Sequence, residues 1–312
     1  MEKLITIVVP AYNEANNLLP LYDQIGHVLS TSIYKWEIIF VNDGSSDHTL
    51  QILKEIATKY SNCKYISFSK NFGKDNALKA GIDHAKGDAV ITMDADLQHP
   101  PSLILELIKK WEEGNEIVYA FRKGANPHSN FFSRMYSSIF WKILKFLSGM
   151  KLEEGISDYR ILDKIVVDEI KKMDEYELFL RGMIKWVGFN QLGIEYVPDE
   201  RFTGESTYSR KALLNLAIHG ITSFSVKPLY MAIYLGFTFS FMSVIYIPYV
   251  LYSLYMHSDV PGWSSTIMTI VFLGGIQLIM IGVIGIYVGK LFMQTKNRPN
   301  YIIQAQNLMT QK

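Results

Sequence analysis

The stretch AVITMDAD, residues 89–96, joins a short apolar run to two carboxylates at alternate positions. An apolar run of about five residues is typical of a buried strand in a parallel sheet. Alternate residues of an extended chain point to the same side, so Asp94 and Asp96 are predicted to face one site. Paired carboxylates suit Mg²⁺ or Mn²⁺, whose remaining ligands are water and a diphosphate.

Apolar runs of the same kind recur before and after this stretch, and segments with helical periodicity separate them. The runs are 4–10, 36–41, 64–68, 89–93 and 117–121, and the helical segments are roughly 15–30, 47–60, 74–85 and 101–113. This alternation predicts an α/β fold with a mostly parallel sheet covered on both faces. Such sheets bind ligands at the carboxyl ends of their strands.

Polar residues follow each of these runs. They are YNE at 12–14, NDGS at 42–45, NFGK at 71–74, DAD at 94–96 and RK at 122–123. Loops are commonly polar, so one such group alone would carry little information. Five in succession, three with carboxylates and two with basic groups, predict a ligand site along one edge of the sheet.

The overall composition excludes several functional classes. The 31 basic and 30 acidic residues give a net charge of +1, so no global field attracts nucleic acid. Cys63 is the only cysteine, which excludes an internal disulfide and a thiolate metal cluster and fits a reducing compartment.

The C-terminal third is suited to a membrane. No Asp, Glu, Lys or Arg occurs between Lys227 and Asp259, or between Asp259 and Lys290. Each interval exceeds the ~20 residues needed to span a bilayer, which predicts two transmembrane helices at about 229–256 and 264–290. Lys and Arg flank these helices, and the connecting turn has neither. The protein is therefore expected to be a multi-pass cell-membrane protein with both termini and its N-terminal domain cytoplasmic.

Two further stretches have a basic face and an aromatic-rich apolar face. The first, at about 130–148, carries Arg134 and Ser138 one helical turn apart, and the second occupies 208–227. Both predict helices in the membrane interface, although the first could instead be an ordinary core helix. The expected organisation is a catalytic domain at 1–207, a juxtamembrane helix at 208–227, the membrane helices within 228–293 and a cytoplasmic tail at 294–312.

Four motifs in this order and spacing resemble the inverting GT-A-type glycosyltransferases of family two. They are PAYNE at 10–14, NDGS at 42–45, NFGK at 71–74 and DADLQHPP at 94–101. More narrowly, the sequence resembles the polyprenyl-phosphate glycosyltransferases, the group of dolichol-phosphate mannose synthase and undecaprenyl-phosphate glucosyltransferase. SDYR at 157–160 and RFTGES at 201–206 extend the resemblance. The family often has two aspartates at 42–43 and Ser-Lys at 206–207, where this chain has Asn-Asp and Ser-Thr.

The resemblance implies a role for particular side chains. The metal ligands would be Asp94, Asp96 and Gln98, and the catalytic residues Asp96 and Asp158, with Asp158 near the transferred sugar. The nucleotide-sugar would be held by Pro10, Tyr12, Glu14, Asp43, Lys74, Asp94 and Arg122. The phosphate of the lipid would be held by Arg134, Ser138, Arg201 and Ser206, and arginine forks suit phosphate oxygens.

The implied reaction is inverting transfer of one sugar, from UDP-glucose or UDP-N-acetylglucosamine, to undecaprenyl or a similar polyprenyl phosphate. A phosphate monoester has a second pKa near ~6 and is already a nucleophile, so a strong protein base is less necessary than for a hydroxyl acceptor. Asp158 is expected to orient the substrates, with a general-base role left open. Expected partners are membrane lipids, a second copy of the chain, a separate flippase and a downstream transferase that modifies surface polysaccharide, with no nucleic acid.

Two other functions are alternatives for this sequence. A processive polysaccharide synthase of the same superfamily would carry Gln-x-x-Arg-Trp and more membrane helices, whereas the nearest string here is LRGMIKW at 180–186. A non-catalytic nucleotide-binding protein of a lipid-sugar flipping system should have lost a metal carboxylate or an acceptor-side arginine. None of these residues is missing from the sequence.

Overall fold

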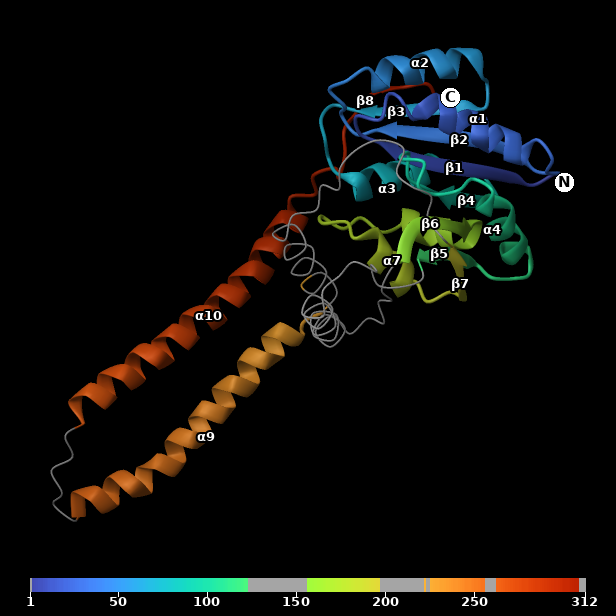
Figure 1. The fold of residues 1–312 in the computed structure, drawn as a ribbon. Helices are drawn as coiled ribbons and strands as arrows, with labels where there is room; N and C mark the ends of the chain where they lie inside the picture. The colour runs from blue at the N-terminus through green and yellow to red at the C-terminus, as the bar shows by residue number, and fades with distance from the viewer. Residues whose placement is uncertain (1, 123–155, 197–221, 223–224, 256–261, 309–312) are drawn as a thin grey trace, which may run out of the picture. The chain divides into compact units, whose positions relative to one another are not determined.

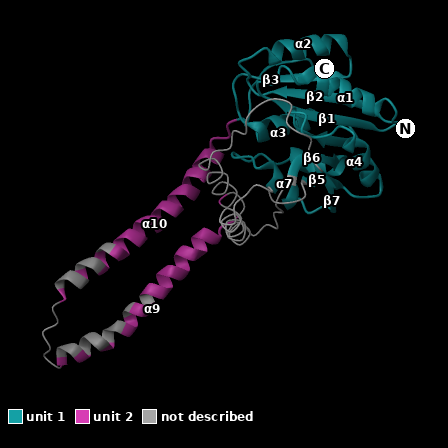
Figure 2. Ribbon diagram, in the orientation of Figure 1, with its two compact units in different colours: residues 1–142, 150–213, 299–312 teal, residues 143–149, 214–298 magenta. Residues whose placement is uncertain are grey.

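The computed structural model describes residues 2–122, 156–196, 222, 225–255 and 262–308. The chain divides into two compact units, which Figure 2 shows in different colours. The first comprises residues 1–142, 150–213 and 299–312, and the second comprises residues 143–149 and 214–298. The first unit therefore contains both the N-terminal motifs and the C-terminal end of the chain.

An eight-stranded sheet forms the centre of the first unit, in the order β7-β5-β6-β4-β1-β2-β3-β8 (Figure 1). Its strands are β1 (Leu4–Ala11), β2 (Lys35–Asn42), β3 (Cys63–Phe68), β4 (Ala89–Thr92), β5 (Ile117–Arg122), β6 (Ile156–Asp163), β7 (Gln191–Tyr196) and β8 (Ile303–Gln306). Strands β1 to β4 pair in parallel, as do β5 and β7, whereas β6 and β8 are antiparallel to their neighbours. The predicted α/β class with a mostly parallel sheet is confirmed, and its five predicted runs are β1 to β5.

Helices cover both faces of this sheet, because successive side chains of each buried strand point to opposite faces. Ile7 on β1 packs in one core cluster with α1, α2 and α4, and its neighbour Val8 packs in another with α3, α6 and α7. The helices are α1 (Leu18–Leu29), α2 (Thr49–Lys59), α3 (Lys74–His84), α4 (Leu103–Glu112), α6 (Lys164–Lys171) and α7 (Leu180–Trp186). Helix α3 lies so close to β1 that a Cβ on Gly81 would be 2.1 Å from the Val8 side chain. This close approach packs the C-terminal half of α3 against β1.

Strand β6 differs from the simple parallel alternation that the sequence predicts. It lies between β4 and β5 and runs antiparallel to both. Because its direction is reversed, its first residues lie at the carboxyl edge of the parallel strands. The Thr92 hydroxyl at the end of β4 donates to the Asp158 carbonyl oxygen at 2.5 Å. The insertion therefore brings the SDYR motif beside the DAD motif.

The second unit contains two long helices within its described residues, α9 (Lys227–Tyr255) and α10 (Trp263–Thr295). The Phe239 and Phe272 rings meet edge to face at 6.1 Å between them, and Pro248 lies inside α9. Among the residues that the structure describes, one segment is long and apolar enough to cross a bilayer, Phe272–Thr295, with a mean hydropathy of 2.0. The predicted interfacial helix at about 130–148 lies outside the described residues, as does most of 208–227.

Candidate active site

A cleft of about 240 Å³ opens at the carboxyl ends of β1, β2 and β4. It is lined by nine residues, which are Pro10, Ala11, Tyr12, Glu14, Asp43, Lys74, Asp94, Ala95 and Asp96. Six of the seven residues assigned to the nucleotide-sugar are among them. The seventh, Arg122, is the last residue of β5. The position of the cleft agrees with the rule that open α/β sheets bind ligands where their strands end.

Backbone groups hold the carboxylate of Asp43 in this cleft. The Phe72 N–H donates to Oδ1 at 2.7 Å, and the Gly73 N–H donates to Oδ2 at 3.0 Å. Asp43 is 3% exposed, and burial raises the pKa of its carboxyl while these two N–H groups oppose the rise. The neighbouring Gly44 has φ +65°, and a Cβ there would be 2.2 Å from the Lys70 backbone. Only glycine permits this approach of the two loops.

The YNE loop is tied to the NDGS loop by hydrogen bonds. The Asn13 N–H donates to the Ser45 hydroxyl at 2.9 Å, and the Asn13 side-chain oxygen accepts from the Ser46 N–H at 2.9 Å. Asn13 has φ +57°, which asparagine tolerates better than most residues. The side chain of Tyr12 is about half exposed. The linked loops thus present an aromatic ring and the Asp43 carboxylate to the same cleft.

The two carboxylates of the DAD motif lie on a loop, because β4 ends at Thr92. They line the same cleft, as the sequence predicts, although the chain is not extended there. The Gln98 N–H donates to Asp96 Oδ1 at 3.1 Å, and the intervening Leu97 has φ +61°. A positive φ is costly for leucine and is typical of functional loops. Within the described residues no three acidic or histidine side chains form a metal site by themselves. Two carboxylates fit Mg²⁺ or Mn²⁺ because such ions keep other positions for water and phosphate oxygens.

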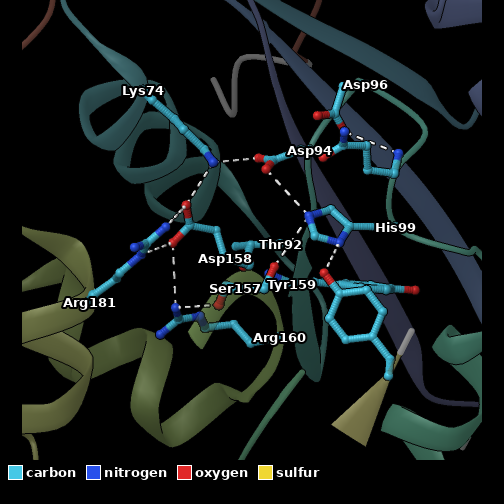
Figure 3. Close-up of polar contacts among 12 residues, drawn as sticks. Lys74, Thr92, Asp94, Asp96, His99, Ser157, Asp158, Tyr159, Arg160 and Arg181 are labelled. Atoms are coloured by element: carbon cyan, nitrogen blue, oxygen red, sulfur yellow. Dashed lines mark hydrogen bonds and ion pairs between the residues drawn. The ribbon is translucent and has the colours of Figure 1, made fainter. Parts of the chain in front are cut away.

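A cluster of charged side chains surrounds Asp158, which is 5% exposed (Figure 3). Arg181 on α7 donates two hydrogen bonds to its carboxylate, from Nε at 2.7 Å and from Nη2 at 2.9 Å. The Lys74 ammonium lies between two carboxylates, 2.7 Å from Asp158 and 2.6 Å from Asp94. Arg160 approaches Asp158 at 3.5 Å and donates to the Ser157 carbonyl oxygen at 2.8 Å. Lys74 thus connects the DAD motif with the SDYR motif.

These partners determine the charges in the cluster. Burial alone would raise the pKa of Asp158, but Lys74 and then Arg181 outweigh it and hold that pKa well below the usual range. Burial would likewise lower the pKa of Lys74, and the Asp158 and Asp94 carboxylates raise it instead. Asp158 is therefore a carboxylate at neutral pH. Burial raises the pKa of nearby Asp75 to about 6, and the Asp158 charge adds to the rise.

His99 connects Asp94, a predicted metal ligand, to two other strands. It is 2% exposed, with Nε2 3.3 Å from Asp94 Oδ2 and 3.2 Å from the Ser157 hydroxyl. Its Nδ1 lies 3.0 Å from the Tyr196 hydroxyl at the end of β7. A histidine that bonds a metal-binding carboxylate fixes the orientation of that carboxylate.

Four charged or polar members of this site were not predicted from the sequence: His99, Arg160, Arg181 and Asp75. His99 and Arg160 belong to the quoted motifs DADLQHPP and SDYR, so their place in those motifs was a usable signal. Arg181 gave no such signal, since it lies 23 residues from Asp158 on a separate helix. The four residues assigned to the lipid phosphate, Arg134, Ser138, Arg201 and Ser206, lie outside the described residues.

The sequence is similar to known proteins of one family. Residues 6–170 match the family described as Glycosyl transferase family 2. The chain belongs to glycosyltransferase family 2. A relative from Bacillus subtilis named "Uncharacterized glycosyltransferase YkcC" is 42% identical over 300 residues, covering 96% of this chain and 93% of the relative. A relative from Shigella phage SfII named "Bactoprenol glucosyl transferase" is 40% identical over 304 residues, covering 97% of this chain and 98% of the relative.

The predicted resemblance to family two is therefore confirmed, and the second relative agrees with the narrower resemblance to polyprenyl-phosphate glycosyltransferases. Among solved structures, mannosyl-3-phosphoglycerate synthase from Rubrobacter xylanophilus superimposes with a TM-score of 0.51 at 14% identity. That match covers 71% of this chain and 73% of the other. It shows that this glycosyltransferase has the GT-A-like α/β fold.

Proposed function

We propose that this glycosyltransferase transfers glucose from UDP-glucose to a polyprenyl phosphate, with inversion at the anomeric carbon. The near full-length similarity to a bactoprenol glucosyl transferase supports both the sugar and the lipid. UDP-N-acetylglucosamine is the other donor to test, because pocket differences of about 1–3 kcal/mol decide between such sugars.

The geometric observation that carries this proposal is the state of Asp158. Three cationic side chains approach it, and its pKa is held well below the usual range. A carboxylate of such low proton affinity is a poor general base at neutral pH. A sugar hydroxyl would need a base, whereas a phosphate monoester is already an anion above its second pKa of about 6. The site therefore favours a phosphate acceptor.

In this proposal the donor lies in the cleft between the YNE, NDGS and DAD motifs. Tyr12 packs on the base, and Asp43 accepts from the base or ribose. A divalent cation held by Asp94, Asp96 and Gln98 would neutralise the departing uridine diphosphate. Lys74 adds a positive charge beside the same leaving group. Asp158 stabilises positive charge on the sugar ring and orients the acceptor while the acceptor oxygen attacks in line.

The acceptor side and the membrane topology complete the proposal. Arg122, Arg134, Ser138, Arg201 and Ser206 bind phosphate groups of the donor and the lipid. Helices α9 and α10 both cross the bilayer, with the catalytic unit and both termini in the cytoplasm. Basic flanks and a connecting turn without Lys or Arg support this orientation. The product then forms on the cytoplasmic leaflet, and a separate flippase transports it.

Product analysis tests the proposed function. Purified enzyme is incubated with Mn²⁺, undecaprenyl phosphate and labelled UDP-glucose, UDP-N-acetylglucosamine or GDP-mannose, and the lipid product is identified by mass spectrometry and NMR. We expect a monoglucosyl lipid with a β-linkage, because the α-linked donor is inverted. Undecaprenol, which has a hydroxyl in place of the phosphate, serves as the control acceptor. Efficient transfer to undecaprenol, or a product with several sugars, would contradict the proposal.

A further inference from the structure

The chain returns to the sheet after the last long helix. We call residues 299–308 the C-terminal strap. Its strand β8 pairs antiparallel with β3, which places it at the edge of the sheet (Figure 1). The Asn307 side chain accepts from the Tyr65 N–H at 2.6 Å, and the Ile302 carbonyl oxygen accepts from the Ser69 N–H at 3.0 Å. The strap therefore bonds both β3 and the first residue after it.

Tyr301 is the aromatic anchor of this strap. Its ring stacks on Phe68, with centroids 5.1 Å apart and planes 15° from parallel. Its hydroxyl donates to Asp83 Oδ2 on α3 at 3.0 Å. Tyr301, Ile303 and Leu308 all pack on the small core cluster that contains Phe68. Tyr301 thus joins the end of β3 to α3, the helix that begins with Lys74.

The loop between β3 and α3 lies between Tyr301 and the nucleotide side of the cleft. The Phe72 ring packs edge to face on the Phe68 ring, with centroids 5.7 Å apart, and Phe68 in turn stacks on Tyr301. The N–H groups of Phe72 and Gly73 are the two donors that hold the Asp43 carboxylate. An unbroken set of contacts therefore runs from Tyr301 through Phe68 and Phe72 to Asp43.

We propose that the C-terminal strap positions residues 69–73, the loop that holds the Asp43 carboxylate, for a nucleoside diphosphate, with Tyr301 as its main positioning residue. Fixing backbone costs about 1–2 kcal/mol for each residue, so a loop that is ordered before binding gives a higher ligand affinity. Residues 69–73 are held from one side by the strap and α3, and from the other by Asp43 and Gly44. Without the Tyr301 ring this loop should fluctuate. Nucleotide binding would then have to order the loop, which lowers the nucleotide affinity.

Three variants separate the ring, the hydroxyl and a nonspecific effect. Tyr301→Leu keeps an apolar side chain but removes the stacked ring, and Tyr301→Phe keeps the ring but removes the bond to Asp83. Ile302→Ala is the matched control, because it shortens the adjacent side chain, which is 51% exposed. Thermal unfolding of each full-length variant in detergent establishes that it is folded.

The experiment combines hydrogen–deuterium exchange of the peptide covering 69–73 with calorimetric titration of uridine diphosphate in the presence of Mn²⁺. For Tyr301→Leu we expect at least tenfold faster exchange and about tenfold weaker affinity, about 1.4 kcal/mol. Tyr301→Phe and Ile302→Ala should stay within about threefold of wild type. Turnover at saturating donor should be unchanged in all three.

Unchanged exchange in Tyr301→Leu would overturn the proposal, and so would faster exchange with unchanged nucleotide affinity. The inference rests on the proposed nucleotide role of Asp43, but its failure can be recognised separately. If wild-type enzyme bound no uridine diphosphate, the proposed donor would be wrong. Guanosine and adenosine diphosphates would then replace it in the same titration, and the exchange measurement would be unaffected.

Discussion

Asp43 and Asp158 are both buried carboxylates at the same edge of the sheet, but opposite kinds of partner hold them. Two backbone N–H groups hold Asp43, and burial raises the pKa of its carboxyl. Lys74, Arg160 and Arg181 surround Asp158, and the pKa of that carboxyl is well below its usual range. The proposed donor side thus contains an anion with uncharged partners, whereas Asp158 is surrounded by ion pairs.

The difference indicates what each carboxylate can do for a ligand. Asp43 has no cationic partner among its described contacts, so in the proposed function its charge is available to an O–H or N–H donor of the nucleotide. Asp158 is already compensated, and removing one member of a buried ion pair typically costs about 3–5 kcal/mol. Substitution at Asp43 should therefore affect donor affinity, and substitution at Asp158 should affect turnover.

Asp158→Asn should give the largest effect on catalysis. The amide cannot balance Lys74 and Arg181 or stabilise positive charge on the sugar ring, so we expect turnover to fall by about 10²–10³-fold. The donor KM should change by less than about threefold. Steady-state kinetics with varied UDP-glucose would measure both, with Asp163→Asn as a control on the same strand. A variant with normal turnover and a greatly raised KM would place Asp158 in the donor site instead.

Asp43→Asn should show the opposite pattern. One acceptor oxygen becomes an NH₂ group that faces the N–H of Phe72 or Gly73, and an unpaired buried donor costs about 1–3 kcal/mol. We expect donor affinity to fall by about 10–100-fold, with turnover at saturation within about threefold of wild type. Titration calorimetry with uridine diphosphate checks the affinity. Equal losses in both parameters would remove the contrast between the two carboxylates.

The sequence predicts the surroundings of Asp43 better than those of Asp158. Continuous apolar runs locate β1 to β5, and the polar residues that follow them predict that Asp43, Asp94 and Asp96 lie at one edge of the sheet. The sequence does not predict the antiparallel insertion of β6, because strand direction depends on contacts distant in sequence. The bidentate bond between Arg181 and Asp158 depends on that insertion. Strand β8 was also not predicted, since four residues after a long apolar helix carry a weak pattern.

His99→Phe should weaken metal binding, although it changes neither of the predicted metal ligands Asp94 and Asp96. The ring loses its contacts with Asp94, Ser157 and Tyr196, so Asp94 is less well oriented. Loss of such a supporting contact typically costs about 10–100-fold in metal affinity, and we expect about tenfold. Manganese titration followed by electron paramagnetic resonance measures it, and exposed His27→Phe is the control. An unchanged affinity would show that His99 has only a packing role.

Asp75→Asn should have the smallest effect, on stability alone. The pKa of Asp75 is about 6 in the fold, above its ordinary value of 3.8, so the protonated form stabilises the fold. As pH rises from about 4 to 6 the unfolded chain loses this proton first, and wild-type stability falls. The neutral amide avoids this loss. The Tm advantage of the variant should therefore grow up to about pH 6 and be constant above it. A difference independent of pH would contradict the assigned titration.

The pH dependence of turnover with two acceptors tests directly whether Asp158 is the base or the acceptor reacts as a phosphate anion. One is a polyprenyl phosphate, and the other is an analogue whose second pKa differs by about one unit. If the acceptor reacts as the anion, turnover has an acidic limb near pH 6 that moves with the acceptor pKa and persists, at lower rate, in Asp158→Asn. An acidic limb that does not move with the acceptor pKa and disappears in Asp158→Asn would identify Asp158 as the base. That result would contradict direct attack by a phosphate anion.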